Sequence, residues 1–226
     1  MSAKAYRCPQ QQGMTLIEIM ISLAIIGFMM AMAWSTITNA SQARITFVGL
    51  EERNHEVRIA LARMTHDLES SYLSSNEDQA FDNRRTMFIG KSEELRFSSF
   101  AHSTLWADAN ESDETLIAYY LDSDKETPGK EALYRKELRR NSNEPWEGEP
   151  GEHDILLRGV EKLSIQYWDW KDKKWQDSWD STKQDAESKR LPTRVRIEVT
   201  YKNARGDELE ISTQARLLLQ EQLGVE

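Results

Sequence analysis

The sequence predicts an α+β protein in which one long N-terminal helix, first transmembrane and then amphipathic, packs on antiparallel β-sheets. Residues 19–43 contain no charged residue, and at about 1.5 Å per residue they exceed the roughly 30 Å hydrocarbon core of a bilayer. From residue 87 onward, short segments of alternating apolar and polar residues follow one another without a helical segment between them. This second observation is typical of antiparallel strands.

The apolar segment 14–34 contains a single charged residue, Glu18. A carboxylate inside a membrane-length helix is costly and is by default a functional residue. Lys4 and Arg7 precede the segment. The positive-inside rule therefore predicts a cytoplasmic N-terminus and a periplasmic location for the rest of the chain.

Three interpretations of this segment differ in how they explain Glu18. In the first, the segment is a secretory signal peptide that is cleaved at Ala31-Met32-Ala33. In the second, it is a plain membrane anchor, which requires only an apolar segment of sufficient length. Neither interpretation gives Glu18 a role. In the third, cleavage after Gly13 creates an α-amino group on Met14, which meets the Glu18 carboxylate of a neighbouring subunit in a helical filament. Two buried opposite charges cost far less than one alone, and their pairing sets the register between subunits. We favour the third interpretation.

Gly13 followed by Met-Thr-Leu-Ile-Glu resembles the class III signal of type IV prepilins and type II secretion pseudopilins. The resemblance implies a pilin-like fold, cleavage after Gly13 by a prepilin peptidase, and N-methylation of the new first residue. Many family members have Phe at that position, where this chain has Met14. Glu18 matches the glutamate that the family uses in assembly.

An apolar stripe at three- and four-residue steps predicts that the helix continues beyond the membrane. The stripe consists of Phe47, Leu50, Val57, Leu61, Met64 and Leu68, with Asn54 as its polar break. Charged residues fall away from the stripe, and Arg63 and Asp67 form a favourable i,i+4 pair among them. The pattern reaches about Tyr72 and ends in Ser74-Ser75-Asn76. We expect a sheet to pack on the stripe.

Period-two alternation predicts the strands. They are expected at 87–90, 94–100, 115–122, 132–139, 154–158, 160–170, 193–202 and 207–218. The clearest is 193–202, where Val195, Ile197 and Val199 alternate with polar residues, so that one face is buried. Gly206 in the following polar turn predicts a hairpin with 207–218.

The predicted organisation is therefore a cleaved prepilin leader at 1–13, a transmembrane helix at 14–37, an amphipathic periplasmic helix at 38–75 and a β-rich globular periplasmic domain at 76–226. The chain has 226 residues and a net charge of −9. Such an acidic chain lacks the excess of positive charge that is typical of proteins that bind nucleic acid. Its one cysteine, Cys8, lies in the leader.

No residue pattern predicts catalysis, a cofactor or a metal site. The histidines His55, His66, His102 and His153 have no metal-ligand spacing, and no nucleophile or phosphate-loop motif occurs. We interpret the first two as exposed helix positions. An acidic cluster, formed by Asp108, Asn110, Glu111, Asp113 and Glu114, could hold calcium. A solvated loop is the interpretation that we favour.

Trp168 and Trp170 are predicted to lie off the core face of their strand, and Trp175 and Trp179 follow after the turn 171–174. Tryptophans in this position form a cross-strand cluster or a docking surface, because Trp is enriched at interface hot spots. The cross-strand cluster is the interpretation that we favour, and Trp168 and Trp170 are kept as a candidate partner surface.

Three further segments, 60–68, 95–99 and 165–169, are similar to segments of the J-class minor pseudopilins. This resemblance implies a subunit of the pseudopilus tip complex in type II secretion, anchored in the bacterial inner membrane. The implied partners are the I- and K-class minor pseudopilins, the major pseudopilin and the prepilin peptidase. The alternatives are a minor pilin of a type IV pilus or DNA-uptake system, and a membrane-anchored periplasmic binding module.

Overall fold

The computed structural model describes residues 13–75, 86–102, 113–139, 152–183, 189–203, 205–220 and 223. The chain divides into two compact units, Met1–Gly49 and Leu50–Glu226. Of the predicted acidic cluster, residues 108–112 lie outside the described residues.

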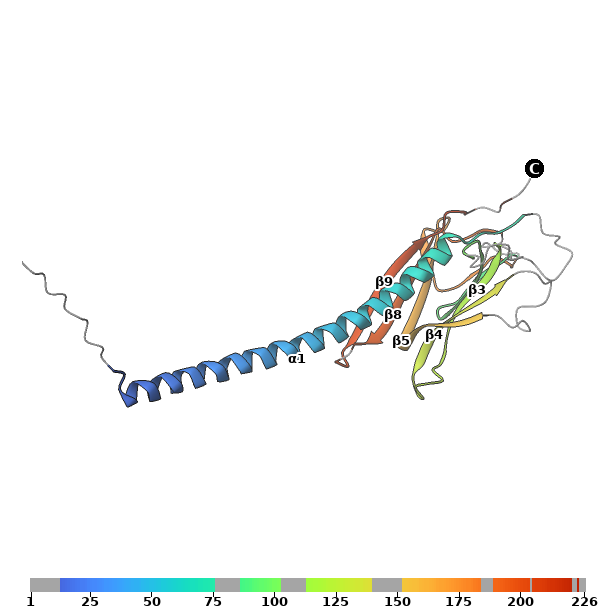
Figure 1. Cartoon of the computed structure of the whole chain (residues 1–226). Coiled ribbons are helices and arrows are strands. Elements are labelled where there is room, and N and C mark those ends of the chain that lie inside the picture. The colour runs from blue at the N-terminus through green and yellow to red at the C-terminus, as the bar shows by residue number, and fades with distance from the viewer. Residues whose placement is uncertain are drawn as a thin grey trace, which may run out of the picture. The chain divides into compact units, whose positions relative to one another are not determined.

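Helix α1 (Leu16–Glu69) has 54 residues and is continuous through Gly49 (Figure 1), which confirms the single predicted helix. In the unit Met1–Gly49 its apolar side chains are exposed, and Leu16 and Trp34 expose 77% and 70% of their surface. By length and composition this helix can cross a membrane. Several of its hydroxyl groups bond within the helix: Ser22 Oγ donates to the carbonyl of Glu18 at 2.7 Å and Thr36 Oγ1 to the carbonyl of Met32 at 2.9 Å, which suits an apolar medium.

The helix ends at Glu69, earlier than the predicted end near Tyr72. The hydroxyl of Ser71 donates to the carbonyl of Leu68 at 2.7 Å, and the backbone N–H of Tyr72 donates to the carbonyl of Ser98 at 3.1 Å. The apolar pattern continues past Glu69, but the backbone there is already bonded to a strand. Local periodicity carries no information about that competing partner.

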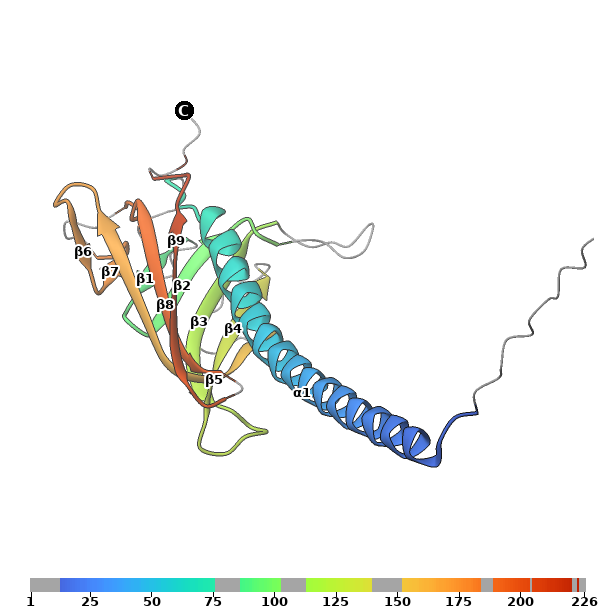
Figure 2. The same ribbon diagram turned by 90° about the vertical axis from the view of Figure 1, so that its left-hand side faces the viewer.

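The described residues form nine antiparallel strands in one sheet, which confirms the α+β class (Figure 2). The strands are β1 (Phe88–Gly90), β2 (Glu94–Ser99), β3 (Thr115–Ser123), β4 (Glu131–Arg139), β5 (Glu152–Asp169), β6 (Lys174–Gln176), β7 (Trp179–Asp180), β8 (Arg194–Lys202) and β9 (Glu208–Arg216). Their order is β7-β1-β2-β3-β4-β5-β8-β9, with β6 paired to β5. Two of these strands, β6 and β7, were not predicted because segments of two or three residues show no periodicity.

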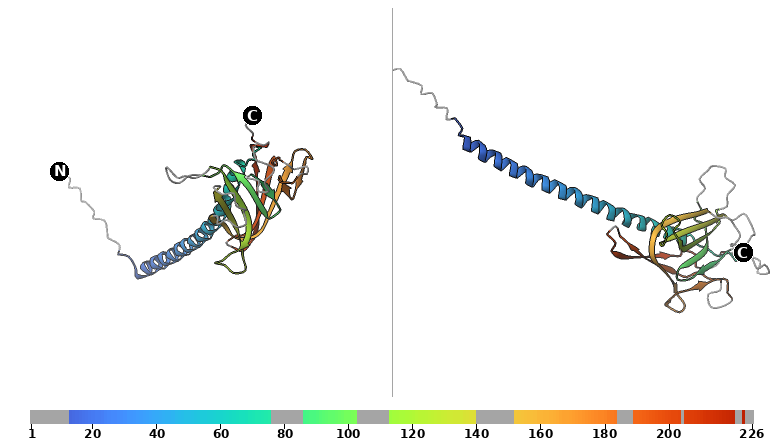
Figure 3. Two further views of the ribbon diagram at one scale, coloured as in Figure 1. Left: turned by 90° about the vertical axis from the view of Figure 1, so that its right-hand side faces the viewer. Right: turned by 90° about the horizontal axis from the view of Figure 1, so that it is seen from below.

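Strand β5 replaces the two predicted strands 154–158 and 160–170. Gly159 has a positive φ of 61°, and the register with β8 shifts between Val160 and Lys162. The first half of β5 pairs with β4 and the second half with β8. The sheet therefore curls (Figure 3), so that the N–H of Ile165 reaches the carbonyl of Ser92, beside β1, at 2.8 Å.

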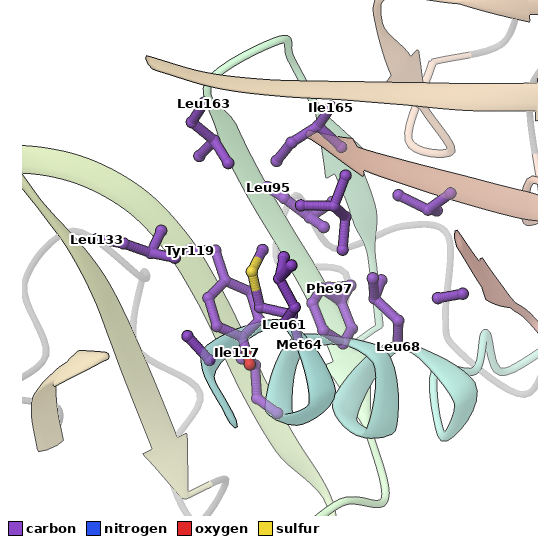
Figure 4. Close-up of a cluster of buried hydrophobic side chains, with 14 of the residues drawn as sticks. Leu61, Met64, Leu68, Leu95, Phe97, Ile117, Tyr119, Leu133, Leu163 and Ile165 are labelled. Atoms are coloured by element: carbon purple, nitrogen blue, oxygen red, sulfur yellow. The ribbon is translucent and has the colours of Figure 1, made fainter. Parts of the chain in front are cut away.

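The core lies between the second half of α1 and the concave face of the sheet (Figure 4). Val57, Met64 and Leu68 are fully buried against Phe97 and other inward-facing strand residues. This confirms the sheet-packing stripe from Val57 onward. Phe47, its first predicted member, is 62% exposed.

The polar break in the stripe has a partner. Tyr201, on the inner face of β8, donates its hydroxyl to the side-chain carbonyl of Asn54 at 2.7 Å. Beside it, Arg53 donates to the backbone carbonyls of Arg158 and Gly159. These bonds tie the first turns of the packed part of α1 to β8 and to the bend in β5.

Candidate functional site

Gly13 and Met14, the two residues of the predicted cleavage site, are both exposed to solvent. Gly13 is exposed and Met14 exposes 74% of its surface. A methyl group built at Gly13 would meet no atom within 4 Å. The peptide bond between these two residues is therefore open to an enzyme.

Glu18 belongs to a capping box at the start of α1. Its carboxylate oxygen Oε2 accepts from the backbone N–H of Thr15 at 2.8 Å and from the Thr15 hydroxyl at 3.0 Å. In return the backbone N–H of Glu18 donates to the Thr15 hydroxyl oxygen at 3.4 Å. With Leu16 as the first helical residue, Thr15 is the N-cap and Glu18 the third residue of the helix.

This local role of the glutamate was not predicted, although Thr-x-x-Glu before an apolar run is its known signature. The capping box uses one carboxylate oxygen only: in the described residues, no hydrogen bond involves Glu18 Oε1. The arrangement leaves that oxygen able to accept from a second group.

The structure corrects the expected position of Asp67. Predicted on the solvent side of α1, its side chain is completely buried between the helix and the sheet. Its oxygen Oδ2 accepts from Arg135 Nε at 2.7 Å and from the Tyr119 hydroxyl at 2.6 Å. The predicted partner Arg63 is present, with 3.2 Å between its Nε and Asp67 Oδ1.

A buried ion cluster extends from Asp67 across β4 and comprises Asp67, Tyr119, Arg135, Glu137 and His102. Arg135 Nη1 donates to Glu137 Oε2, and Nδ1 of His102 lies 2.7 Å from Glu137 Oε1. Burial opposes ionisation of Glu137, but the hydrogen bond and charge of Arg135 outweigh it and lower the Glu137 pKa. Burial, followed by the charge of Asp67, raises the pKa of Tyr119. Tyr119 is thus a neutral phenol, and Arg135 and Glu137 form an ion pair beside it.

This cluster fits a structural role. It joins α1, β3, β4 and the segment after β2, and every member is nearly or fully buried. Within the described ranges, no group of three or more His, Cys, Asp or Glu side chains could hold a metal ion. His55 and His66 are exposed on the helix, as predicted.

The tryptophans separate into two environments. Trp168 and Trp175 form an edge-to-face pair on the outer face of β5 and β6, with ring centroids 5.3 Å apart, which confirms a cross-strand pair. Trp170 is 49% exposed, with the ammonium of Lys171 5.7 Å from its ring centroid. Trp179, in contrast, is completely buried in the core. The sequence did not predict this burial, because β7 is too short to show alternation.

A hollow of about 740 Å³ lies on the outer face of β2 to β5. Its lining combines both charges and consists of Lys91, Ser92, Glu93, Glu94, Arg96, Ala118, Tyr120, Leu121, Lys136 and His153. Arg96 Nε donates to Glu94 at 2.6 Å, and the Tyr120 hydroxyl lies 3.0 Å from Nδ1 of His153. The Tyr120–His153 contact is exposed, and side chains paired with one another in this way are typical of a solvated surface.

Comparison with known proteins covers most of the chain. The model of a family described as type II secretion system (T2SS), protein J, matches residues 35–207. A second model, described as the prokaryotic N-terminal methylation motif, matches residues 8–34. No curated protein matches the chain.

Among solved structures, similarity is found to a chain in the crystal structure of the GspK-GspI-GspJ complex from the enterotoxigenic Escherichia coli type 2 secretion system. The TM-score is 0.45 and the sequence identity 17%, over 73% of this chain and 97% of that chain.

Proposed function

Because this chain belongs to the protein J family of the type II secretion system, we propose that it works at the tip of the pseudopilus, where it supports protein export across the outer membrane. It is a membrane-anchored minor pseudopilin. The observation that carries this proposal is the family match, which begins within α1 and extends through the sheet to the turn after β8. The role is structural: the chain contributes surfaces and a membrane helix to an assembly.

Processing is proposed to occur between Gly13 and Met14. The accessible peptide bond and the N-terminal methylation motif support cleavage of the leader 1–13 by a prepilin peptidase and methylation of the new amino group on Met14. Lys4 and Arg7 leave with the leader. They hold the N-terminus on the cytoplasmic side, so that residues 14–37 span the inner membrane and the rest is periplasmic.

Glu18 is proposed to direct assembly without giving up its capping role. Its Oε2 caps the helix through Thr15, while Oε1 accepts from the ammonium group of Met14 on a neighbouring subunit. Capping holds the carboxylate in one orientation before assembly, which reduces the entropy lost when the pair forms. In lipid, the pairing also removes the cost of leaving an ionised carboxylate alone.

The proposed partners are the I- and K-class minor pseudopilins and the major pseudopilin. Trp170, half exposed beside the Trp168–Trp175 pair, is part of the candidate surface for one of them. Trp168 already packs on Trp175. Its truncation would therefore change stability as well as binding, and Trp170→Ala is the cleaner test of docking.

A clean deletion of the gene tests the proposal when secreted enzymes and surface pili are scored in the same strain. We expect exoproteins to accumulate in the periplasm while pili persist, and the wild-type chain to restore secretion. Lost pili with intact secretion would support a minor pilin of a type IV pilus or DNA-uptake system instead. If both phenotypes stay normal and the purified chain binds a small ligand, it acts as a periplasmic binding module.

Mass spectrometry of the membrane-extracted chain tests the processing site. We expect a mature N-terminus at methylated Met14. A chain that begins at Trp34 would instead identify the segment as an ordinary signal peptide.

A further inference from the structure

Three arginines lie next to the Trp168–Trp175 pair on the outer face of β5, β6, β8 and β9. The register places Trp175, Trp168, Arg194 and Arg216 in one row across these four strands. Arg196 lies in the adjacent row of the same face. We call these five residues the arginine–tryptophan face.

Arg194 and Arg216 are exposed and stand directly opposite each other in the β8–β9 hairpin. Directly opposed side chains have Cβ atoms about 5 Å apart, and like charges in that position destabilise a sheet. In the part of the chain that the structure describes, no carboxylate forms an ion pair with Arg194, Arg196 or Arg216. Within the described residues, no ion pair offsets the repulsion expected between these two opposed arginines.

This cationic face belongs to an acidic chain. The net charge of the whole sequence is −9, so three arginines that form no ion pair within the described residues depart from the average surface. The carboxylate of Asp177, at the edge of the face, accepts from the side-chain amide of Gln166 at 3.0 Å. A partner that brings carboxylates would relieve the repulsion between the arginines and pair with them.

Arg196 is held ready for such a partner. Its guanidinium carbon lies 4.1 Å from the ring centroid of Trp175, and its Nη1 donates to Gln166 Oε1 at 3.3 Å. Stacking occupies the flat face of a guanidinium and leaves its edge, with further N–H donors, for a carboxylate. Because the side chain is already ordered, less entropy is lost on binding.

We propose that the arginine–tryptophan face binds a carboxylate-bearing segment of a partner protein. Arg194 and Arg216 pair with its acidic side chains, Arg196 binds a further carboxylate edge-on, and the tryptophans pack on the apolar parts of the segment. Arg and Trp are the residue types that dominate protein interfaces energetically. This inference goes beyond the proposed function and does not depend on tip assembly, because it concerns the isolated full chain.

Arg216→Glu tests the proposal, because it separates binding from folding. In the fold, the new glutamate faces Arg194 and converts a repulsive cross-strand pair into an attractive one. The melting temperature of the full chain in detergent should therefore be unchanged or higher. Arg205→Glu is the matched control, since it makes the same charge change at an exposed residue in the turn at the other end of the hairpin.

Binding is measured by fluorescence anisotropy with a labelled peptide of eight glutamates, and in parallel by flotation with phosphatidylglycerol vesicles. We expect peptide binding that weakens with salt, falls at least tenfold in Arg216→Glu and stays near wild type in Arg205→Glu. Equal loss in both variants, or no binding of the peptide by the wild type, would overturn the proposal. Flotation with vesicles in the absence of peptide binding would also overturn it and identify a lipid-binding face.

Discussion

Replacing Asp67 by asparagine tests whether the buried ion cluster holds α1 on the sheet. Asparagine keeps the shape and one acceptor oxygen but removes the charge that faces Arg135 at 2.7 Å. The Arg135 side chain is 3% exposed, so water cannot replace the missing carboxylate. Removing one partner of a buried ion pair costs about 3–5 kcal/mol.

The expected loss for Asp67→Asn lies at the lower end of that range, about 3 kcal/mol, because Glu137 still compensates part of the Arg135 charge. Such a loss is a large fraction of the roughly 5–15 kcal/mol that stabilises a domain. Urea unfolding of the full chain in detergent, followed by near-ultraviolet circular dichroism, measures it as a lower midpoint at constant slope.

Glu69→Gln is the matched control for Asp67→Asn. It makes the same carboxylate-to-amide change two residues later on the same helix, at an exposed position, and should alter stability by less than about 0.5 kcal/mol. If Asp67→Asn lowers the free energy of unfolding by less than about 1 kcal/mol, the reasoning is refuted, because an ordinary neutral hydrogen bond contributes that much.

Three other changes have expected outcomes. Gly90→Ala would press a methyl carbon into the ring of the buried Tyr167, and we expect urea unfolding to show a loss of about 1–3 kcal/mol from overpacking. The pKa of Glu137 is lowered in the folded state. The stabilisation that this carboxylate provides is therefore complete above the unfolded-state pKa of about 4.3, and it is lost as the pH falls through the folded-state pKa. Urea unfolding measured between pH 3 and 7 should show this loss of stability, and the loss should be smaller in Glu137→Gln. Glu18→Ala should leave cleavage before Met14 intact, as measured by mass spectrometry, and should abolish secretion, as measured by an exoprotein assay. Secretion at the wild-type level would refute the assembly role of Glu18.

The candidate site could be predicted from the sequence where its signal is local. Gly13, Met14 and Glu18 stand in a short contiguous pattern, and the Thr15–Glu18 capping box lies within the same few residues, so its signature is also local. The arginine–tryptophan face could not be predicted in this way. The opposition of Arg194 and Arg216 depends on hairpin register, and the nearness of Trp175 depends on β6 pairing with β5.

By itself the sequence determined the elements that repeat over many residues. The long apolar helix, its buried stripe and the alternation of Val195, Ile197 and Val199 are properties of consecutive residues, and burial follows them directly. Only the tertiary structure decided the role of Asp67, because its partner Arg135 is distant in sequence. It also decided the burial of Trp179, which depends on two residues of β7 joining the edge of the sheet. At these positions, contacts between residues that are distant in sequence determine burial and stability, and no local sequence pattern indicates such contacts.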